Sequence, residues 1–141
     1  MIFEHTLEKV LSGETTQTSR LIKSDTEVVL DGIVIVSVMQ NNRYQYRVGA
    51  TYRVQPARGQ GGIQRIRIVQ IQNRDVRYFD DSDIAREGFS SYDEFIKAWA
   101  TMHDVALVKG FDLTGITPDY LYQRPHDRYQ AWVLVFELVR S

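Results

Sequence analysis

The sequence has no cysteine, only three prolines among 141 residues and no long apolar run. The missing cysteine excludes disulfides, cysteine nucleophiles and thiolate metal sites. The longest apolar stretch, Ile33 to Met39, is interrupted by Ser37 and is far shorter than the roughly 20 residues of a membrane-spanning helix. Glu4 stands where a signal peptide carries basic residues. We therefore expect a single cytoplasmic domain over 1–141 with no membrane partner.

Neither sign of charge dominates, but arginine is concentrated in the middle of the chain. Seventeen Lys and Arg against eighteen Asp and Glu leave a formal net charge of −1. Residues 43–77 hold eight arginines, one acid (Asp75) and no lysine, a balance of +7, so the rest of the chain carries −8. These arginines are either solvent-facing strand positions paired with acids or a basic face that binds a polyanion such as RNA. They are Arg43, Arg47, Arg53, Arg58, Arg65, Arg67, Arg74 and Arg77.

Turn signals divide the chain into short elements. Leu7, Val10 and Leu11 recur at helical spacing and predict a helix over 4–12 that ends at Gly13. Asp31-Gly32 predicts a hairpin between two β-branched runs. Further helices are expected over about 83–87 and from a capping box at Ser91 onward. The expected strands are 26–30, 33–39, 44–48, 51–55, 63–71 and 131–139, and residues 104–130 are expected to be irregular.

This order of elements predicts an α+β fold, a small mixed barrel or sheet with helices packed on it. In the strand expected over 63–71, Arg65 and Arg67 share one face and Ile66 and Ile68 the other. The strand over 131–139 is apolar apart from Glu137, as expected of a strand buried in the core.

A polar segment between Gly13 and Arg20 is the first candidate for a binding site. Four hydroxyl residues, one Gln and Arg20 follow a helix that ends at glycine. Hydroxyls beside an arginine offer several donors to an oxyanion or to the edge of a base. Alternatively, these side chains only bond their own backbone, as they often do in turns.

The same segment opens a series of motifs that covers nearly the whole chain. Its residues are Val10-Leu11-Ser12-Gly13-x-x-Thr16-x-Thr18-x-Arg20. The next motifs are Tyr46-Arg47-Val48-Gly49, Tyr52-Arg53-Val54-Gln55-Pro56-x-Arg58-Gly59, Ile66-Arg67-Ile68, Asp83-x-Ala85-x-Glu87-Gly88-Phe89-x-Ser91, Phe95 with Trp99, and Trp132-Val133-Leu134-x-Phe136-Glu137. In this order they resemble the ASCH domain, a branch of the PUA-like superfamily, and 104–130 looks like an insertion.

The resemblance implies a PUA-like β-barrel of five or six mixed strands with flanking short helices and a cleft between barrel and helices. PUA-like domains bind RNA or nucleotides, so the implied partner is RNA or a modified nucleoside or nucleotide. Thr16, Thr18, Arg20 and Glu87 would line the cleft. The residues that would attract backbone phosphate are Arg47, Arg53, Arg58 and Arg67.

The resemblance also implies an alternative, a small amidohydrolase that acts on an acylated nucleoside such as acetylcytidine. In that ASCH branch activity is tied to a Gly-x-Lys-x-x-Thr motif and a helical glutamate, which here correspond to Thr18 and Glu87 as catalytic residues. The lysine position is occupied by Thr15, whose hydroxyl cannot do the work of an amine without a partner base. We therefore expect a binding module rather than an enzyme. Glu87 is equally well explained as a structural carboxylate paired with an arginine.

No metal or cofactor is expected. His5, His103 and His126 lack ligand spacing, and no phosphate loop, dinucleotide fingerprint or Gly-x-Ser-x-Gly motif is present. Trp99 and Trp132 are expected in the core. The tyrosines and arginines of 104–130 either stack bases or pack that segment over the barrel.

Overall fold

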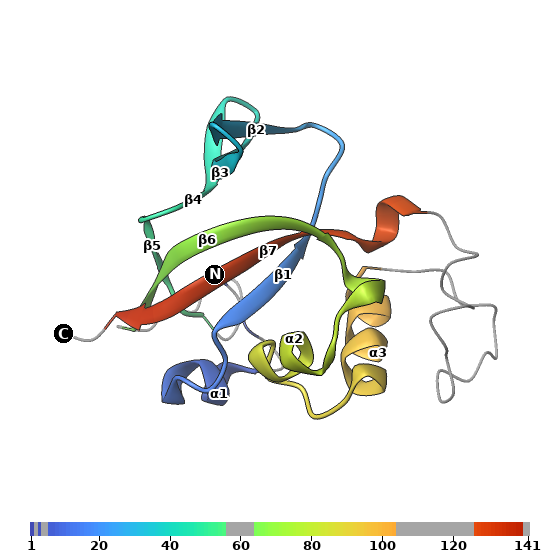
Figure 1. The fold of residues 1–141 in the computed structure, drawn as a ribbon. Coiled ribbons are helices and arrows are strands. Elements are labelled where there is room, and N and C mark those ends of the chain that lie inside the picture. Colours follow the sequence, from blue (N-terminus) through green and yellow to red (C-terminus); the bar gives the residue numbers. More distant parts are fainter. Residues whose placement is uncertain (2, 4–5, 56–63, 104–125, 140–141) are drawn as a thin grey trace.

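The computed structural model describes residues 1, 3, 6–55, 64–103 and 126–139 (Figure 1). The helices in this part of the chain are α1 (Leu7–Ser12), α2 (Asp81–Arg86) and α3 (Tyr92–Met102), with 3₁₀ turns η1 (Val76–Tyr78) and η2 (His126–Tyr129). The strands are β1 (Gln17–Leu21), β2 (Thr26–Asp31), β3 (Val34–Gln40), β4 (Arg43–Arg47), β5 (Thr51–Arg53), β6 (Arg65–Asp75) and β7 (Gln130–Val139). None of these helices is long and apolar enough to cross a membrane.

The strands form two sheets, one of four strands in the order β1-β7-β6-β5 and one of three in the order β2-β3-β4. The long strands β6 and β7 curve along the four-stranded sheet, and the smaller sheet lies over β6 (Figure 1). The α+β class and the barrel-like shape are confirmed. The expectation of five or six mixed strands is wrong, because seven strands are described and all of their pairs are antiparallel.

Strand β1 is the element that the sequence did not predict. Its residues, Gln-Thr-Ser-Arg-Leu, carry no apolar alternation. It forms because its backbone pairs in register with β7, from Gln17 opposite Val135 to Leu21 opposite Ala131. Its polar side chains are buried or half-buried in the fold, and Gln17 is only 1% exposed.

Gly49 connects the two sheets. Its φ of +88° is a left-handed conformation that glycine adopts at low cost. The Gly49 N–H donates to the Ile68 carbonyl at 2.8 Å, and the Ile68 N–H donates to the Ala50 carbonyl at 3.1 Å. The small sheet is thereby attached to the middle of β6.

The core lies on both faces of β7. Trp132, Leu134 and Phe136 face the side covered by the small sheet and the N-terminal segment. Ala131 and Val133 face α2 and α3. The expected burial of both tryptophans is confirmed, since Trp99 and Trp132 are each 3% exposed.

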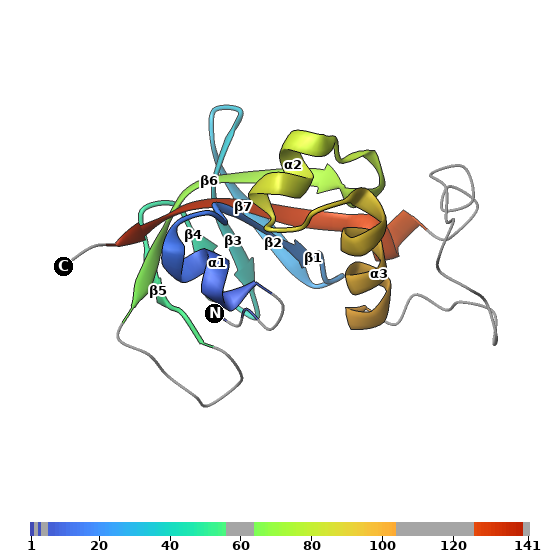
Figure 2. The same ribbon diagram turned by 90° about the horizontal axis from the view of Figure 1, so that it is seen from below.

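Helices α1 and α3 lie on either side of β1, and α2 packs against β1 and α3 (Figure 2). Helix α3 begins where the Ser91 hydroxyl accepts the Glu94 N–H at 3.2 Å. Its Phe95, Ile96, Trp99 and Ala100 are buried. The expected hairpin at Asp31-Gly32 is present, and a second tight turn lies at Asn41-Asn42, where both residues have a positive φ.

Most element boundaries differ from the expected ones by a few residues. The first helix begins at Leu7 rather than at 4, and β6 extends to Asp75 rather than ending at 71. Helix α2 begins earlier than expected because Asp80 and Asp83 form a capping box. Of the segment expected to be irregular, 104–125 lies outside the described residues, whereas His126–Tyr129 is a 3₁₀ turn.

Candidate functional site

A pocket of about 70 Å³ opens beside the edge strand β1, between the start of α1 and helix α3. Its polar lining consists of Thr18, Ser19, Arg20 and Glu87, with Thr6 at the start of α1. Its aromatic walls are Phe3, Phe89, Phe95 and Trp99. A cavity of about 150 Å³ can hold benzene, so the enclosed part of this pocket receives one edge or one small substituent of a ring. A few polar groups in an apolar lining are typical of small-molecule sites.

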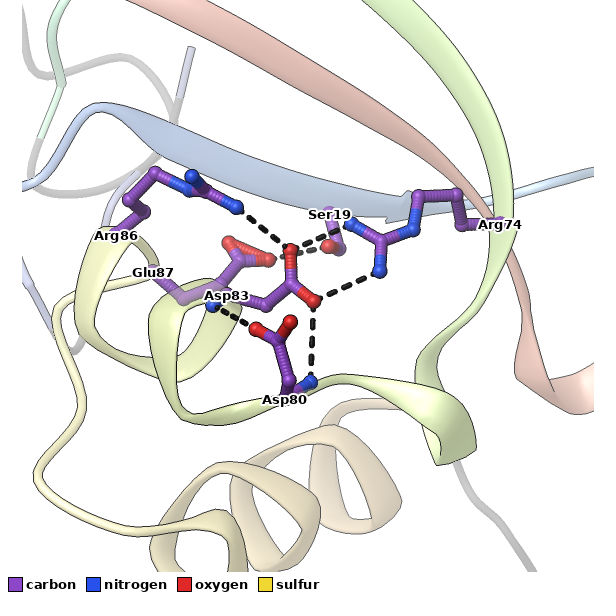
Figure 3. A network of polar contacts seen from close by, with 6 residues as sticks. All are labelled: Ser19, Arg74, Asp80, Asp83, Arg86 and Glu87. Atoms are coloured by element: carbon purple, nitrogen blue, oxygen red, sulfur yellow. Dashed lines mark hydrogen bonds and ion pairs between the residues drawn. The ribbon is translucent and has the colours of Figure 1, made fainter.

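Glu87 is the most unusual group in this pocket. It follows α2, is only 4% exposed and accepts a hydrogen bond from the Ser19 hydroxyl at Oε1 (Figure 3). Burial raises the pKa of the Glu87 carboxyl to about 7, although the Ser19 hydrogen bond and the charge of Arg20 act in the opposite direction. The carboxyl therefore gains and loses its proton near neutral pH, as a group that binds a ligand or transfers a proton does.

Arg20 reaches the pocket from the face of β1 opposite to Ser19, because successive strand residues alternate. Its guanidinium lies 5.3 Å from the centre of the Phe3 ring. Burial lowers the pKa of Arg20 below its ordinary value, and Tyr46 and Glu87 oppose this shift. The pocket thus combines a positive charge with a carboxyl that is neutral below about pH 7.

An ion network around the buried Asp83 holds α2, and with it Glu87, against β6. Arg74 donates to both carboxylate oxygens of Asp83, at 2.5 and 2.7 Å, and Arg86 donates to the same group at 3.0 Å (Figure 3). Asp83 is 1% exposed and also accepts the Asp80 N–H at 3.1 Å. Burial by itself would raise the pKa of Asp83, but these hydrogen bonds hold it well below its usual range.

The arginine-rich segment does not form a single basic face. Arg74 belongs to the network around Asp83, and Arg77, 2% exposed, is paired with Asp75 at 2.5 Å. For these two residues the expected pairing with acids is confirmed, but the expectation of a solvent-facing strand position is wrong for Arg77, which is buried and lies in η1. Arg67, on the exposed face of β6, pairs with Glu137 at 3.2 Å.

Arg47 and Arg53, two further arginines predicted to bind phosphate, lie at exposed ends of the strands β4 and β5. Arg47 is exposed and its guanidinium lies 4.8 Å from the centre of the Tyr44 ring. Arg53 is exposed on β5, opposite Arg65. Neither of them, nor Arg67, lines the pocket. Arg58 lies outside the described residues.

The predicted cleft residues separate into two groups. Thr18, Arg20 and Glu87 line the pocket together, whereas Thr16 does not. The Thr16 backbone instead joins α2 to β7, since its N–H donates to the Arg86 carbonyl and its own carbonyl accepts the Phe136 N–H.

Thr15, at the position of the motif lysine, is 2% exposed and packs against Gly88 outside the pocket lining. The Lys9 amine donates to the Gly88 carbonyl at 2.8 Å and does not line the pocket either. The described part of the pocket lining therefore contains no lysine.

No family model matches the chain, and no curated protein matches it in sequence. The structure is similar to the crystal structure of protein EF3133 from Enterococcus faecalis V583, of the family model DUF984, with a TM-score of 0.52. The two sequences are 14% identical over 96% of this chain and 71% of that chain. The likeness therefore concerns the fold alone. Within the described residues no group of histidines and acids could hold a metal ion.

Sequence reasoning placed Ser19 in the candidate polar segment without naming it as a cleft residue, and it missed Phe3. In a strand, Ser19 points to the face opposite Thr18 and Arg20, so the pattern alone does not bring all three to one pocket. They meet because β1 is an edge strand and the pocket lies along its free edge. The burial of Phe3 beside Arg20 depends on the pairing of its N–H with the Gln55 carbonyl at 2.9 Å.

Gly88 allows the close approach of α2 to the segment before β1, which gives a testable prediction. Gly88 and Gly49 have nearly the same left-handed φ, +89° and +88°, but a Cβ on Gly88 would overlap the Thr15 hydroxyl, whereas one on Gly49 would meet nothing within 4 Å. We expect Gly88→Ala to reduce the free energy of unfolding by about 2 kcal/mol more than Gly49→Ala. Urea unfolding of both variants measures this, and equal losses would contradict it.

Proposed function

We propose that the chain is a PUA-like domain of the ASCH type that binds a nucleoside or nucleotide, free or as part of RNA, in the pocket beside β1. The observation that carries this proposal is the buried Glu87 carboxyl, which shares a pocket with Arg20, Thr18 and aromatic side chains. The position of the pocket, between the sheet and α3, agrees with the cleft that the family resemblance implies.

A nucleobase fits this chemistry because it is a flat ring with a polar edge. Its faces suit the aromatic walls, and its edge suits a carboxyl, a guanidinium and hydroxyls in close proximity. The small enclosed volume leaves the sugar and phosphate at the mouth. Phe3 lines the pocket, and its N–H donates to the carbonyl of Gln55, two residues after Arg53. The exposed Arg53 therefore lies on the segment next to this wall, and the phosphates of a longer RNA would extend toward it.

Thermal-shift titration with nucleosides, nucleotides and short single-stranded RNA tests the proposal. A ligand at a hundred times its dissociation constant stabilises the protein by about 2.7 kcal/mol, which raises the melting temperature measurably. We expect Glu87→Gln to weaken binding by about tenfold, while the matched variant Glu94→Gln, on the exposed first turn of α3, retains it.

Two outcomes would contradict the proposal. One is the absence of a shift with every ligand. The other is a shift with RNA that fades with salt and is the same in Glu87→Gln, because binding would then take place on exposed arginines rather than in the pocket.

The alternative, hydrolysis of an acylated nucleoside such as acetylcytidine, is favoured by one observation. A carboxyl with a pKa of about 7 is suited to general base catalysis near neutral pH, and the Thr18 hydroxyl could orient the substrate. The position of Thr15 argues for binding instead, since no amine lines the described pocket. Deacetylation of acetylcytidine by the protein, lost in Glu87→Gln, would support the hydrolase over the binding module.

A further inference from the structure

The backbone of β1 has one open edge. The Thr16 carbonyl accepts the Phe136 N–H at 2.9 Å and the Ile22 N–H donates to the Gln130 carbonyl at 3.0 Å. Because the register between these two bonds has no shift, hydrogen-bonded and non-bonded residue pairs alternate along β1. The backbone groups of Ser19 therefore point away from β7, and among the described strands none lies on that side.

This open edge lies in the pocket. The side chains of Thr18 and Arg20 project from one face of β1, and the Ser19 hydroxyl on the other face contacts Glu87. All four residues line the same pocket, which must therefore pass the edge of the strand at Ser19. The N–H and C=O of Ser19 are thus a donor and an acceptor side by side at the wall of the pocket.

We propose that the ligand pairs with the Ser19 backbone, as a neighbouring strand would, and that the favoured ligand is a uracil-type base. Its ring N–H donates to the Ser19 carbonyl, and one of its ring carbonyls accepts the Ser19 N–H. This inference rests on the proposed nucleoside binding and specifies the class of base.

Two observations favour this class over others. The positive charge of Arg20 beside the edge favours a base whose N–H is flanked by carbonyl oxygens, as in uracil, over one that presents an amino group there. The enclosed pocket of about 70 Å³ admits only one edge of a base, so the N–H and the carbonyl that pair with Ser19 must be neighbours on that edge, as they are in uracil.

Ligand analogues test the pairing without changing the protein. The test is a titration of ¹⁵N-labelled protein with uridine, 3-methyluridine and 2′-O-methyluridine, in which the Ser19 amide signal is followed by NMR. The 3-methyl group replaces the ring N–H, whereas the 2′-O-methyl group adds the same atoms on the sugar. We expect uridine and 2′-O-methyluridine to shift the Ser19 amide signal and 3-methyluridine to bind at least about tenfold more weakly.

Two substitutions test the same pairing from the side of the protein. Ser19→Ala removes only the hydroxyl, whereas Ser19→Pro also removes the backbone N–H, which the β1–β7 ladder does not use. We expect uridine to bind Ser19→Pro about tenfold more weakly than Ser19→Ala. If Ser19→Pro does not fold, the analogue series decides.

The outcomes separate this inference from the function on which it rests. Equal binding of uridine and 3-methyluridine, or binding of uridine that leaves the Ser19 amide unmoved, overturns the pairing but not the pocket. If cytidine or a purine nucleoside binds and uridine does not, the assigned class of base is wrong. The absence of binding by any nucleoside overturns the proposed function itself.

Discussion

Replacement of Glu87 by glutamine is expected to stabilise the protein at pH 8 and to change its stability little at pH 4. In the folded protein, burial raises the pKa of this carboxyl from 4.5 to about 7. The unfolded chain thus releases its proton at a lower pH than the folded protein does. Stability is fully present below pH 4.5, falls as the pH rises toward 7 and is constant above it.

The size of this effect follows from the pKa difference. A carboxyl pKa of 4.5 in the unfolded chain and about 7 in the folded protein corresponds to a loss of about 3 kcal/mol of unfolding free energy at pH 8. Glu87→Gln has no carboxyl to ionise, so we expect it to avoid this loss. The glutamine carbonyl can still accept the hydrogen bond of Ser19.

Urea unfolding of the wild type, Glu87→Gln and Glu94→Gln at pH 4, 6 and 8 measures this dependence. Glu94 is exposed on α3 and serves as the matched control. A stability difference between Glu87→Gln and the wild type that is the same at all three pH values would mean that burial does not perturb Glu87.

The second large effect is expected from Asp83→Asn. This substitution removes the charge that holds Arg74 and Arg86, and it leaves the part-buried guanidinium of Arg74 without its ion-pair partner. Loss of one member of a fully buried ion pair reduces stability by about 3–5 kcal/mol, and because Arg74 and Arg86 are 31% and 48% exposed we expect a smaller loss of about 2 kcal/mol. The Asp83 carboxylate also accepts the Asp80 N–H at the start of α2. In Asp83→Asn we therefore expect the start of α2 to loosen, and Glu87, one helical turn later, to lose its fixed position.

Chemical unfolding together with nucleoside titration measures both consequences. Asp93→Asn, at an exposed position in the first turn of α3, is the matched control and should change neither stability nor binding by more than about 0.5 kcal/mol. If Asp83→Asn unfolds like Asp93→Asn, the network does not hold α2. If it is destabilised but binds nucleosides unchanged, Glu87 does not depend on the network for its position.

Local signals in the sequence predicted the elements that are determined by residues close to one another in the sequence. The hairpin at Asp31-Gly32, the start of α3 at Ser91 and the apolar strand β7 follow from turn chemistry, capping and a run of apolar residues. Strand β1 was missed because pairing with β7, more than a hundred residues away, stabilises it rather than its own composition.

Packing, rather than distance along the chain, decided the roles of the charged residues, since Asp83 is nine positions from Arg74 and Asp75 only two from Arg77. The cluster of arginines is visible in the sequence. The sequence does not show that Arg74 forms an ion pair with Asp83 and Arg77 with Asp75. Such pairing depends on where β6 ends relative to α2, which is a property of packing. The phosphate-binding roles of Arg47, Arg53, Arg58 and Arg67 remain predictions.

The sequence by itself determined which chemical groups the site can use: hydroxyls and Arg20 in one segment, Glu87 in another and no cysteine anywhere. Only the tertiary structure decided that Ser19 and Glu87, 68 positions apart, are in contact, and that both line one pocket together with Thr18 and Arg20 of the edge strand β1. The physical reason is that the pKa of Glu87 and the open hydrogen-bonding groups of Ser19 arise from burial and from strand order, which exist only once distant segments pack together.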